Sequence, residues 1–158
     1  MNISWNNLKV SIAGAKLSHL VQKDKIWDHG SMVEQVRTVF IHLKKAFQRS
    51  DAEIVKKWMT ESAFKKIKYQ IEHTTNENQN IIYNEIEEIS ILNVTPGKKK
   101  KPDKFIAFIK FKRNVEEKNI FSFSAKNKEG ECAEEKWLFL RNGEWWLLDE
   151  IKSIYSNY

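Results

Sequence analysis

The chain changes its hydrophobic period near residue 80, and this change divides it into two halves. Before residue 74, apolar residues recur every three or four positions, as they do on one face of a helix. After residue 80, apolar and polar residues alternate, which is typical of strands that are buried on one side. The pattern predicts an α+β fold, with helices in the first half and an antiparallel sheet in the second.

The first predicted helix, at residues 6–22, is only weakly amphipathic. Its apolar side carries Leu8, Ile12, Ala15 and either His19 or Leu20. Packing on the body of the domain is the simpler interpretation of so narrow a stripe. Contact with a membrane or a partner protein is the alternative.

The next helix has the clearest amphipathic pattern in the chain. A capping box at residues 31–34 predicts its start, because the oxygen of Ser31 can accept a hydrogen bond from a free backbone amide. Its inward stripe consists of Met32, Val36, Val39, Phe40, Leu43, Ala46 and Phe47. A second capping box, at residues 50–53, begins a short helix, and Thr60 caps the last one. The inward residues of these two helices are Ile54, Val55, Trp58, Met59, Phe64, Ile67 and Ile71.

Strands are expected in the second half at residues 86–94, 104–113, 119–126, 131–141 and 144–151. The Asn142-Gly143 dipeptide predicts a tight hairpin between the last two. A two-residue turn there pairs Phe139 with Trp146, and one face then carries Trp137, Phe139, Trp146 and Leu148. The opposite face carries Leu138, Leu140, Trp145 and Leu147, so it is apolar as well. We expect the N-terminal helix, the C-terminal tail, a second subunit or a ligand to cover it.

The length fits one domain, with a helical extension at residues 1–26, the α+β domain at 27–152 and a tail at 153–158. No apolar run is long enough to span a bilayer, and polar residues interrupt the N-terminus where a signal peptide would be apolar. The one cysteine, Cys132, allows no internal disulfide and is expected to be a small packed side chain. We therefore expect a soluble, cytoplasmic protein.

The basic residues are concentrated in one segment. Residues 98–118 hold nine basic and three acidic side chains, and this excess equals the net charge of +6 of the whole chain. The candidate contact residues are Lys98, Lys99, Lys100, Lys101 and Lys104. They could solubilise a loop and discourage edge-to-edge pairing, or they could bind phosphate groups. The aromatic residues nearby, Phe105 and Phe111, fit a sheet core better than a stacking surface, so we favour anionic lipid over nucleic acid.

No constellation in the sequence indicates catalysis, a cofactor or a metal ion. The four histidines have no metal-ligand spacing, and the five glycines form no phosphate-binding loop. The predicted hairpin register places Glu135 opposite Glu150, where two close carboxylates could create a general acid. Solvated strand ends explain these carboxylates equally well. We expect no enzymatic activity.

Several segments, taken in order, resemble the Tim44-like domain family. They are Val36-Arg-Thr-Val-Phe40 with Ala46-Phe47, then Asp51 and Trp58-Met-Thr-Glu61, then Glu135-Lys-Trp-Leu-Phe-Leu-Arg141, and finally Trp145-Trp-Leu-Leu-Asp-Glu-Ile151. The resemblance covers about residues 27–151. It implies a cone-shaped fold like that of nuclear transport factor two, with helices in the concave face of a curved antiparallel sheet. It also implies a non-catalytic role in binding lipid, protein or both at a membrane, which here would be the inner membrane.

Three hypotheses for the function remain. The first is a membrane-peripheral module that binds anionic lipid head groups or a membrane protein. The second is a soluble small-molecule carrier, or an isomerase or dehydratase of the same fold, which would need an ionisable residue at the base of its pocket. The third is a homodimeric scaffold that associates through the sheet. The expected pocket wall consists of Phe40, Leu43, Phe47, Trp58, Ile67, Trp137 and Phe139, and its apolar character favours the first hypothesis over an enzyme.

Overall fold

The computed structural model describes residues 4–73, 81–114 and 131–154. Its helical elements are α1 (Trp5–Leu20), the 3-10 turn η1 (Lys25–Trp27), α2 (His29–Arg49), the 3-10 segment η2 (Ala52–Trp58) and α3 (Glu61–His73). The strands are β1 (Ile81–Thr95), β2 (Lys104–Asn114), β3 (Glu131–Asn142) and β4 (Trp145–Ser153). The strand predicted at residues 119–126 lies outside the described residues.

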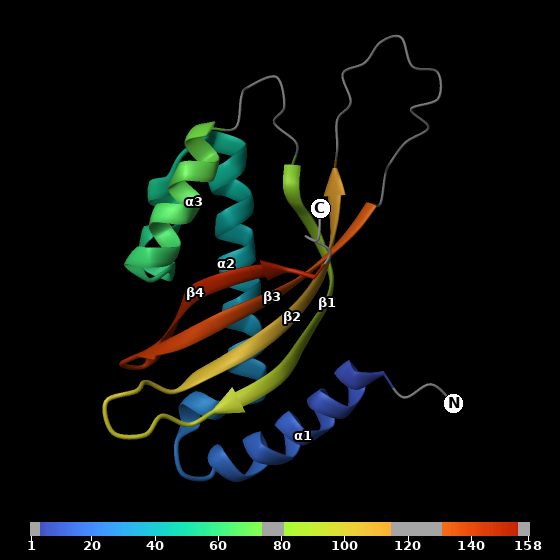
Figure 1. The fold of residues 1–158 in the computed structure, drawn as a ribbon, viewed down its shortest axis with the longest axis vertical. Helices are drawn as coiled ribbons and strands as arrows, with labels where there is room; N and C mark the ends of the chain where they lie inside the picture. Colours follow the sequence, from blue (N-terminus) through green and yellow to red (C-terminus); the bar gives the residue numbers. More distant parts are fainter. Residues whose placement is uncertain (1–3, 74–80, 115–130, 155–158) are drawn as a thin grey trace.

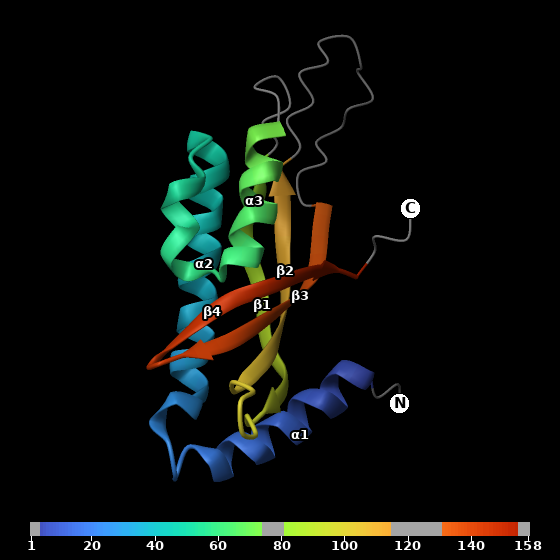
Figure 2. The same cartoon turned by 60° about the vertical axis from the view of Figure 1, so that its left-hand side comes forward.

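The four described strands form one antiparallel sheet in the order β1-β2-β3-β4. The sheet is strongly curved, with α2 and α3 against one side and α1 lying across one end (Figures 1 and 2). The α+β prediction is therefore confirmed, and the arrangement agrees with the cone that the resemblance implies.

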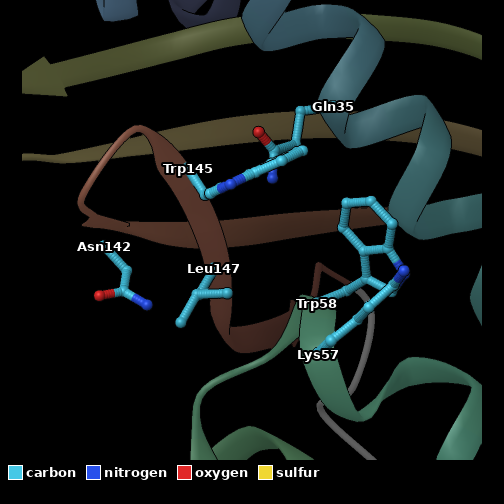
Figure 3. A pocket seen from close by; sticks show the side chains of 6 residues that line it. All are labelled: Gln35, Lys57, Trp58, Asn142, Trp145 and Leu147. Atoms are coloured by element: carbon cyan, nitrogen blue, oxygen red, sulfur yellow. The ribbon is translucent and has the colours of Figure 1, made fainter.

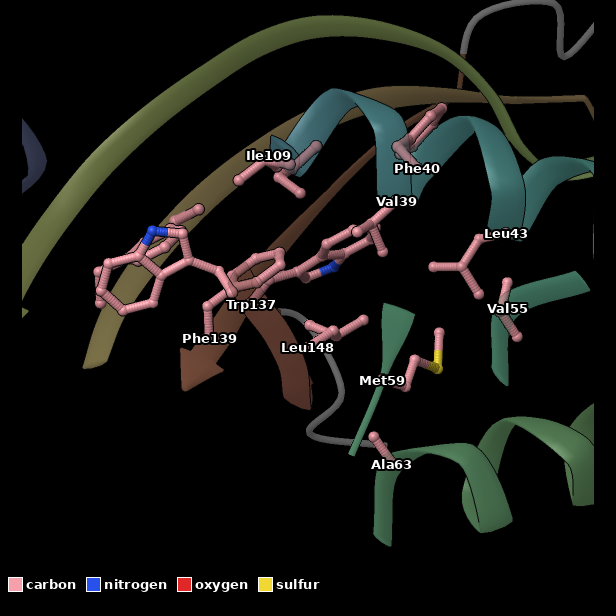
Figure 4. Packing of buried hydrophobic residues seen from close by; sticks show 14 of the residues in the cluster. Val39, Phe40, Leu43, Val55, Met59, Ala63, Ile109, Trp137, Phe139 and Leu148 are labelled. Atoms are coloured by element: carbon pink, nitrogen blue, oxygen red, sulfur yellow. The ribbon is translucent and has the colours of Figure 1, made fainter. Parts of the chain in front are cut away.

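The core forms where the apolar stripe of α2 meets the inward face of the sheet (Figure 4). All seven residues of the predicted stripe are buried, as are the alternating apolar residues of β2. Phe40 lies at the centre of this packing. Its ring centroid is 5.4 Å from that of Phe111, 5.5 Å from that of Tyr83 and 6.2 Å from that of Trp137. These aromatic contacts fix the helix against β1, β2 and β3.

Two helices start at residues other than the predicted caps. Asp28 caps α2, and its carboxylate accepts hydrogen bonds from the backbone amide and the hydroxyl of Ser31 at 2.9 and 2.8 Å. Asp51 caps η2, because Ser50 adopts a left-handed conformation (φ 50°) that ends α2. In both cases an aspartate near the predicted serine takes its role, since its negative charge also favours a helix N-terminus. The cap at Thr60 is confirmed by its hydrogen bond from the first turn of α3.

The β3–β4 hairpin has the predicted faces but not the predicted register. Phe139 pairs with Leu148 instead of Trp146, and the turn consists of Gly143 and Glu144 because Asn142 pairs with Trp145. The partner of Phe139 thus lies two positions further along β4 than predicted. Side chains in a strand alternate with a period of two, so the same residues still face the core.

The outer face of the hairpin is only partly covered. Trp145 is exposed, and Leu138, Leu140 and Leu147 are half-buried. The N-terminal helix is not the cover, because α1 packs against β1. Among the described residues nothing covers the outer face completely, and residues 155–158 of the predicted C-terminal tail lie outside the described residues.

Candidate functional site

The connection between β1 and β2 projects from the end of the sheet where α1 lies (Figures 1 and 2). We call residues 98–101 the lysine turn, since all four are exposed lysines. Its backbone closes through a hydrogen bond of 3.1 Å from the amide of Lys101 to the carbonyl of Lys98. Lys104 follows, exposed, at the start of β2.

Local ion pairs divide the basic segment into two parts. On β2, the ammonium groups of Lys110 and Lys112 lie 3.8–3.9 Å from glutamate oxygens of β1. Within the described part of the chain, none of the lysines of the lysine turn forms an ion pair. The strand lysines therefore have acidic neighbours, whereas the turn lysines have no ion-pair partner among the described residues.

Arg141 holds the lysine turn in place. Its Nη1 atom lies 2.6 Å from Oδ2 of Asp24, just after α1, and 3.0 Å from Oδ2 of Asp103, just after the turn. The backbone amide of Arg141 also donates to the carbonyl of Asp103 at 2.9 Å. Hydrogen bonds to Asp24 and Asp103 raise the pKa of Arg141, and the bond from Arg141 lowers the pKa of Asp24. One side chain thus joins β3, the segment after α1 and the lysine turn.

The backbone of this connection is tightly wound. The amide of Gly97 donates to the carboxylate of Asp103 at 2.6 Å, and a Cβ at position 97 would lie 2.1 Å from the carbonyl oxygen of Lys101. Only glycine fits there without a change in the backbone. Lys99 adopts φ 56°, a left-handed conformation that costs a lysine about 1–3 kcal/mol.

The helix α1 has two apolar faces, and the predicted one points outward. Ala13 and Leu17 are buried against β1, whereas Leu8 is exposed and Ile12 is 51% exposed. Trp5, which is 77% exposed, shares the outward face because it lies three and seven positions before them. The prediction that Leu8 and Ile12 pack inward is therefore wrong. The alternative of a surface helix with an unburied apolar stripe fits the structure better.

The seven residues that were expected to line one pocket lie in different places. Phe40, Leu43, Trp137 and Phe139 belong to the closely packed core (Figure 4). Phe47 and Ile67 line a cavity between α3 and the sheet, and Trp58 lines a separate cleft.

The cavity has a volume of about 640 Å³ and lies between α3 and the strand ends that are farthest from α1. Its polar centre is Glu135, which is 4% exposed and is the only buried charged residue in the part of the chain described. The Oε1 atom of Glu135 accepts a hydrogen bond of 3.3 Å from Nε1 of Trp137, and the hydroxyl of Tyr83 donates to the same carboxyl group. Burial raises the pKa of Glu135, although these two donors and the charge of Arg113 oppose the shift. Burial also raises the pKa of Tyr83 well above its ordinary value.

The predicted hairpin register indicated that a facing Glu150 could raise the pKa of Glu135, and this reason is wrong. In the observed register Glu135 pairs with Ser153, and Glu150 pairs with Leu138. The pKa of Glu135 is therefore raised by desolvation under α3, not by a facing carboxylate. Strand alternation places Glu135 on the same inward face as Trp137 and Phe139, so this pattern could have revealed its burial.

A family model of the Tim44-like domain matches residues 13–151. The chain belongs to the Tim44-like domain family. The match begins inside α1 and runs through all four described strands, so the second half of that helix is part of the matched region. A comparison with curated proteins found no match.

The second cleft of this Tim44-like domain lies between η2 and the tip of the hairpin (Figure 3). It has a volume of about 260 Å³, and the rings of Trp58 and Trp145 meet edge to face across it at 5.8 Å. At its side the amide group of Gln35 bonds with the backbone amide and carbonyl of Trp146. Together with the bridge between Met59 and Leu148, these bonds engage the outer edge of β4, which limits its pairing with another strand.

Three further observations concern this Tim44-like domain. Within residues 4–73, 81–114 and 131–154, no helix is long and apolar enough to cross a membrane, and no group of three His, Cys, Asp or Glu side chains could hold a metal ion. Cys132 is exposed rather than packed, and its thiol donates to Glu87 at 3.3 Å. This hydrogen bond raises the pKa of the Cys132 thiol, which makes it a weaker nucleophile.

Proposed function

We propose that this Tim44-like domain is a non-catalytic module that attaches peripherally to anionic membranes. The lysine turn and the outward face of α1 would make the contact. The observation that carries the proposal is the presence of unpaired lysines and an exposed apolar helix face at one end of the molecule.

The two surfaces suit the two layers of a membrane interface. Lysines near an anionic surface contribute about 1 kcal/mol each, so the lysine turn supplies a reversible electrostatic attraction. Exposed tryptophan and aliphatic side chains on a helix that lies along the surface enter the boundary between head groups and acyl chains. Trp5 and Ile12 supply such side chains, and Lys9 and Lys16 lie exposed on the same helix.

Their relative position supports a single contact. The link through Arg141 joins Asp24, which follows α1, to Asp103, which follows the lysine turn. The two surfaces are therefore held together by the fold, and less entropy is lost on binding than with two flexible segments.

Co-sedimentation with vesicles tests the proposal. The wild type should bind vesicles that contain an anionic lipid and should not bind vesicles of zwitterionic lipid alone. Binding should weaken with added salt, because screening shortens the range of the attraction. Replacing Lys98, Lys99, Lys100 and Lys101 with Gln should weaken binding by more than about a hundredfold, since four contributions of roughly 1 kcal/mol are lost.

The matched control removes the same charge from another side of the molecule. Lys45, Lys56, Lys65 and Lys68 are exposed residues of α2, η2 and α3, and their replacement with Gln should leave binding nearly unchanged. A separate variant, Trp5→Ser with Ile12→Ser, should remove the part of the binding that persists at high salt.

Two results would overturn the proposal. Equal losses in the two lysine variants would mean that only the net charge matters and that the lysine turn is a solubilising loop. Absence of wild-type binding to anionic vesicles would favour a protein partner at the membrane instead.

A further inference from the structure

We infer that the cavity between α3 and the sheet binds a small amphipathic carboxylic acid. Its carboxylate would meet Arg113 and Lys66, and its apolar part would lie against Phe47 and Ile67. This site lies at the other end of the sheet from the proposed membrane contact and does not depend on it.

The size and walls of the cavity suit one small ligand. Its volume of about 640 Å³ lies within the range of about 300–1,000 Å³ that is typical of small-molecule sites. Phe47, Ala63, Ile67 and Ile151 provide apolar surface from α2, α3 and β4. The other lining residues are polar, and the two buried ones, Tyr83 and Glu135, lie with Arg113 on β1, β3 and β2. A ligand with one polar end can place that end there and its apolar part against the apolar residues.

Three carboxylates and two basic side chains line the cavity, and among the described residues the groups without a hydrogen-bonded or ion-paired partner are the basic ones. The acidic residues at the β4 side are already engaged, because Asp149 accepts a hydrogen bond of 2.7 Å from Thr60 and Glu150 pairs with Lys152 at 3.8 Å. In the described part of the chain neither Lys66 nor Arg113 forms an ion pair. Arg113 acts on Glu135 through its charge, but its buried Nε atom has no hydrogen-bond partner there. A buried N–H group is a donor that requires an acceptor, which a ligand carboxylate would supply.

The protonation state of Glu135 controls the affinity of the cavity for such an anion. Tyr83 of β1 and Trp137 of β3 donate to its carboxyl group, and Arg113 of β2 acts on it through its charge. The other titratable and charged groups around the same cavity are Lys66, Tyr69, His73, Asp149 and Glu150. When Glu135 is ionised it repels an incoming carboxylate, and when it is protonated it can donate a hydrogen bond to it. Binding of the acid should therefore be accompanied by uptake of a proton, and its affinity should fall as the pH rises.

Calorimetric titration of the purified chain with decanoate, below its micelle concentration and without vesicles, tests this inference. We expect saturable binding of one decanoate per chain, with no comparable binding of decanol or decyltrimethylammonium, which share its chain length. Arg113→Gln should weaken decanoate binding by about tenfold or more, because a charge-assisted hydrogen bond is lost. The substitution removes no hydrogen bond of the Nε atom, although it removes the charge that acts on Glu135. Circular dichroism should verify that the variant is folded.

Two variants complete the experiment. Arg37→Gln removes the same charge from an exposed position of α2 and should leave the affinity unchanged. Glu135→Gln keeps a neutral side chain with a hydrogen-bond donor at this position. Because glutamine does not titrate, the affinity of this variant for decanoate should lack the fall with pH that Glu135 causes.

The possible results are separable. Tighter binding of decyltrimethylammonium than of decanoate would mean that the ligand's head group is cationic. Much tighter binding of decyl phosphate or inorganic phosphate would make this a phosphate site. An unchanged affinity in Arg113→Gln, or no binding of decanoate at all, would also overturn the inference. Because the titration contains no membrane, these outcomes leave the vesicle experiment unaffected.

Discussion

Replacing Phe40 with alanine should cost about 3–5 kcal/mol of unfolding free energy, the range for deleting a buried aromatic ring from a core. The structure favours the upper part of this range. The residue is 2% exposed and its ring contacts those of Tyr83, Phe111 and Trp137, which come from three different strands. Each aromatic pair contributes about 0.5–1.5 kcal/mol beyond the area that it buries. The cavity cannot close easily, because these neighbours are themselves fixed by the sheet.

Urea unfolding followed by tryptophan fluorescence and by circular dichroism measures this loss. Domains of this size are typically stable by about 5–15 kcal/mol, so Phe40→Ala should remain partly or fully folded in water. Phe40→Leu keeps most of the apolar volume and should lose clearly less. The next residue, Ile41, provides the matched control: it lies on the same helix but is 43% exposed, and Ile41→Ala should cost under about 1 kcal/mol.

A loss of less than about 1 kcal/mol in Phe40→Ala would refute the central position of Phe40 in the core. A similar loss in Phe40→Ala and Ile41→Ala would show that α2 is rotated relative to the sheet. Coincident transitions with the two spectroscopic probes are required for either conclusion, since they indicate two-state unfolding.

Three further predictions follow from single features of the fold. Asp28→Ala should destabilise the domain by about 1 kcal/mol in urea unfolding, more than Ser31→Ala, because Asp28 caps α2. The pKa of Glu135 is raised in the folded state, so its contribution to stability is complete below its unfolded pKa and is lost as the pH rises through its folded pKa. The urea midpoint should therefore fall over this pH range, and Glu135→Gln should remove that fall. If the outer face of the hairpin is a twofold interface, sedimentation at micromolar concentration should show a dimer that Trp145→Ser converts to a monomer, whereas a monomeric wild type would contradict it.

Local patterns in the sequence were enough to predict most elements and the side that they bury. The stripe of α2 and the alternation in β2 lead to the correct buried residues, because helical and strand periods relate neighbours a few positions apart. The same holds for the faces of the hairpin, which survive a register error of two residues. The exposure of the lysine turn was equally predictable, since four consecutive charged residues next to Gly97 can hardly be buried.

Other features depend on which distant segments meet, and the sequence could not decide them. α1 has two apolar faces, and only its contact with β1 determines that Ala13 and Leu17 point inward while Ile12 stays exposed. Arg141 joins Asp24 and Asp103, which lie 117 and 38 positions away along the chain. Such pairings leave no periodic trace in the sequence.

The candidate sites divide in the same way. The basic turn follows from the amino-acid pattern alone, because a run of like charges is exposed almost regardless of the fold. The cover of Glu135 by α3, and its hydrogen bonds from Tyr83 and Trp137, depend on the packing of distant segments. A carboxylate is solvated or desolvated according to what covers it. The cover of Glu135 comes from α3, which lies more than sixty positions earlier in the chain.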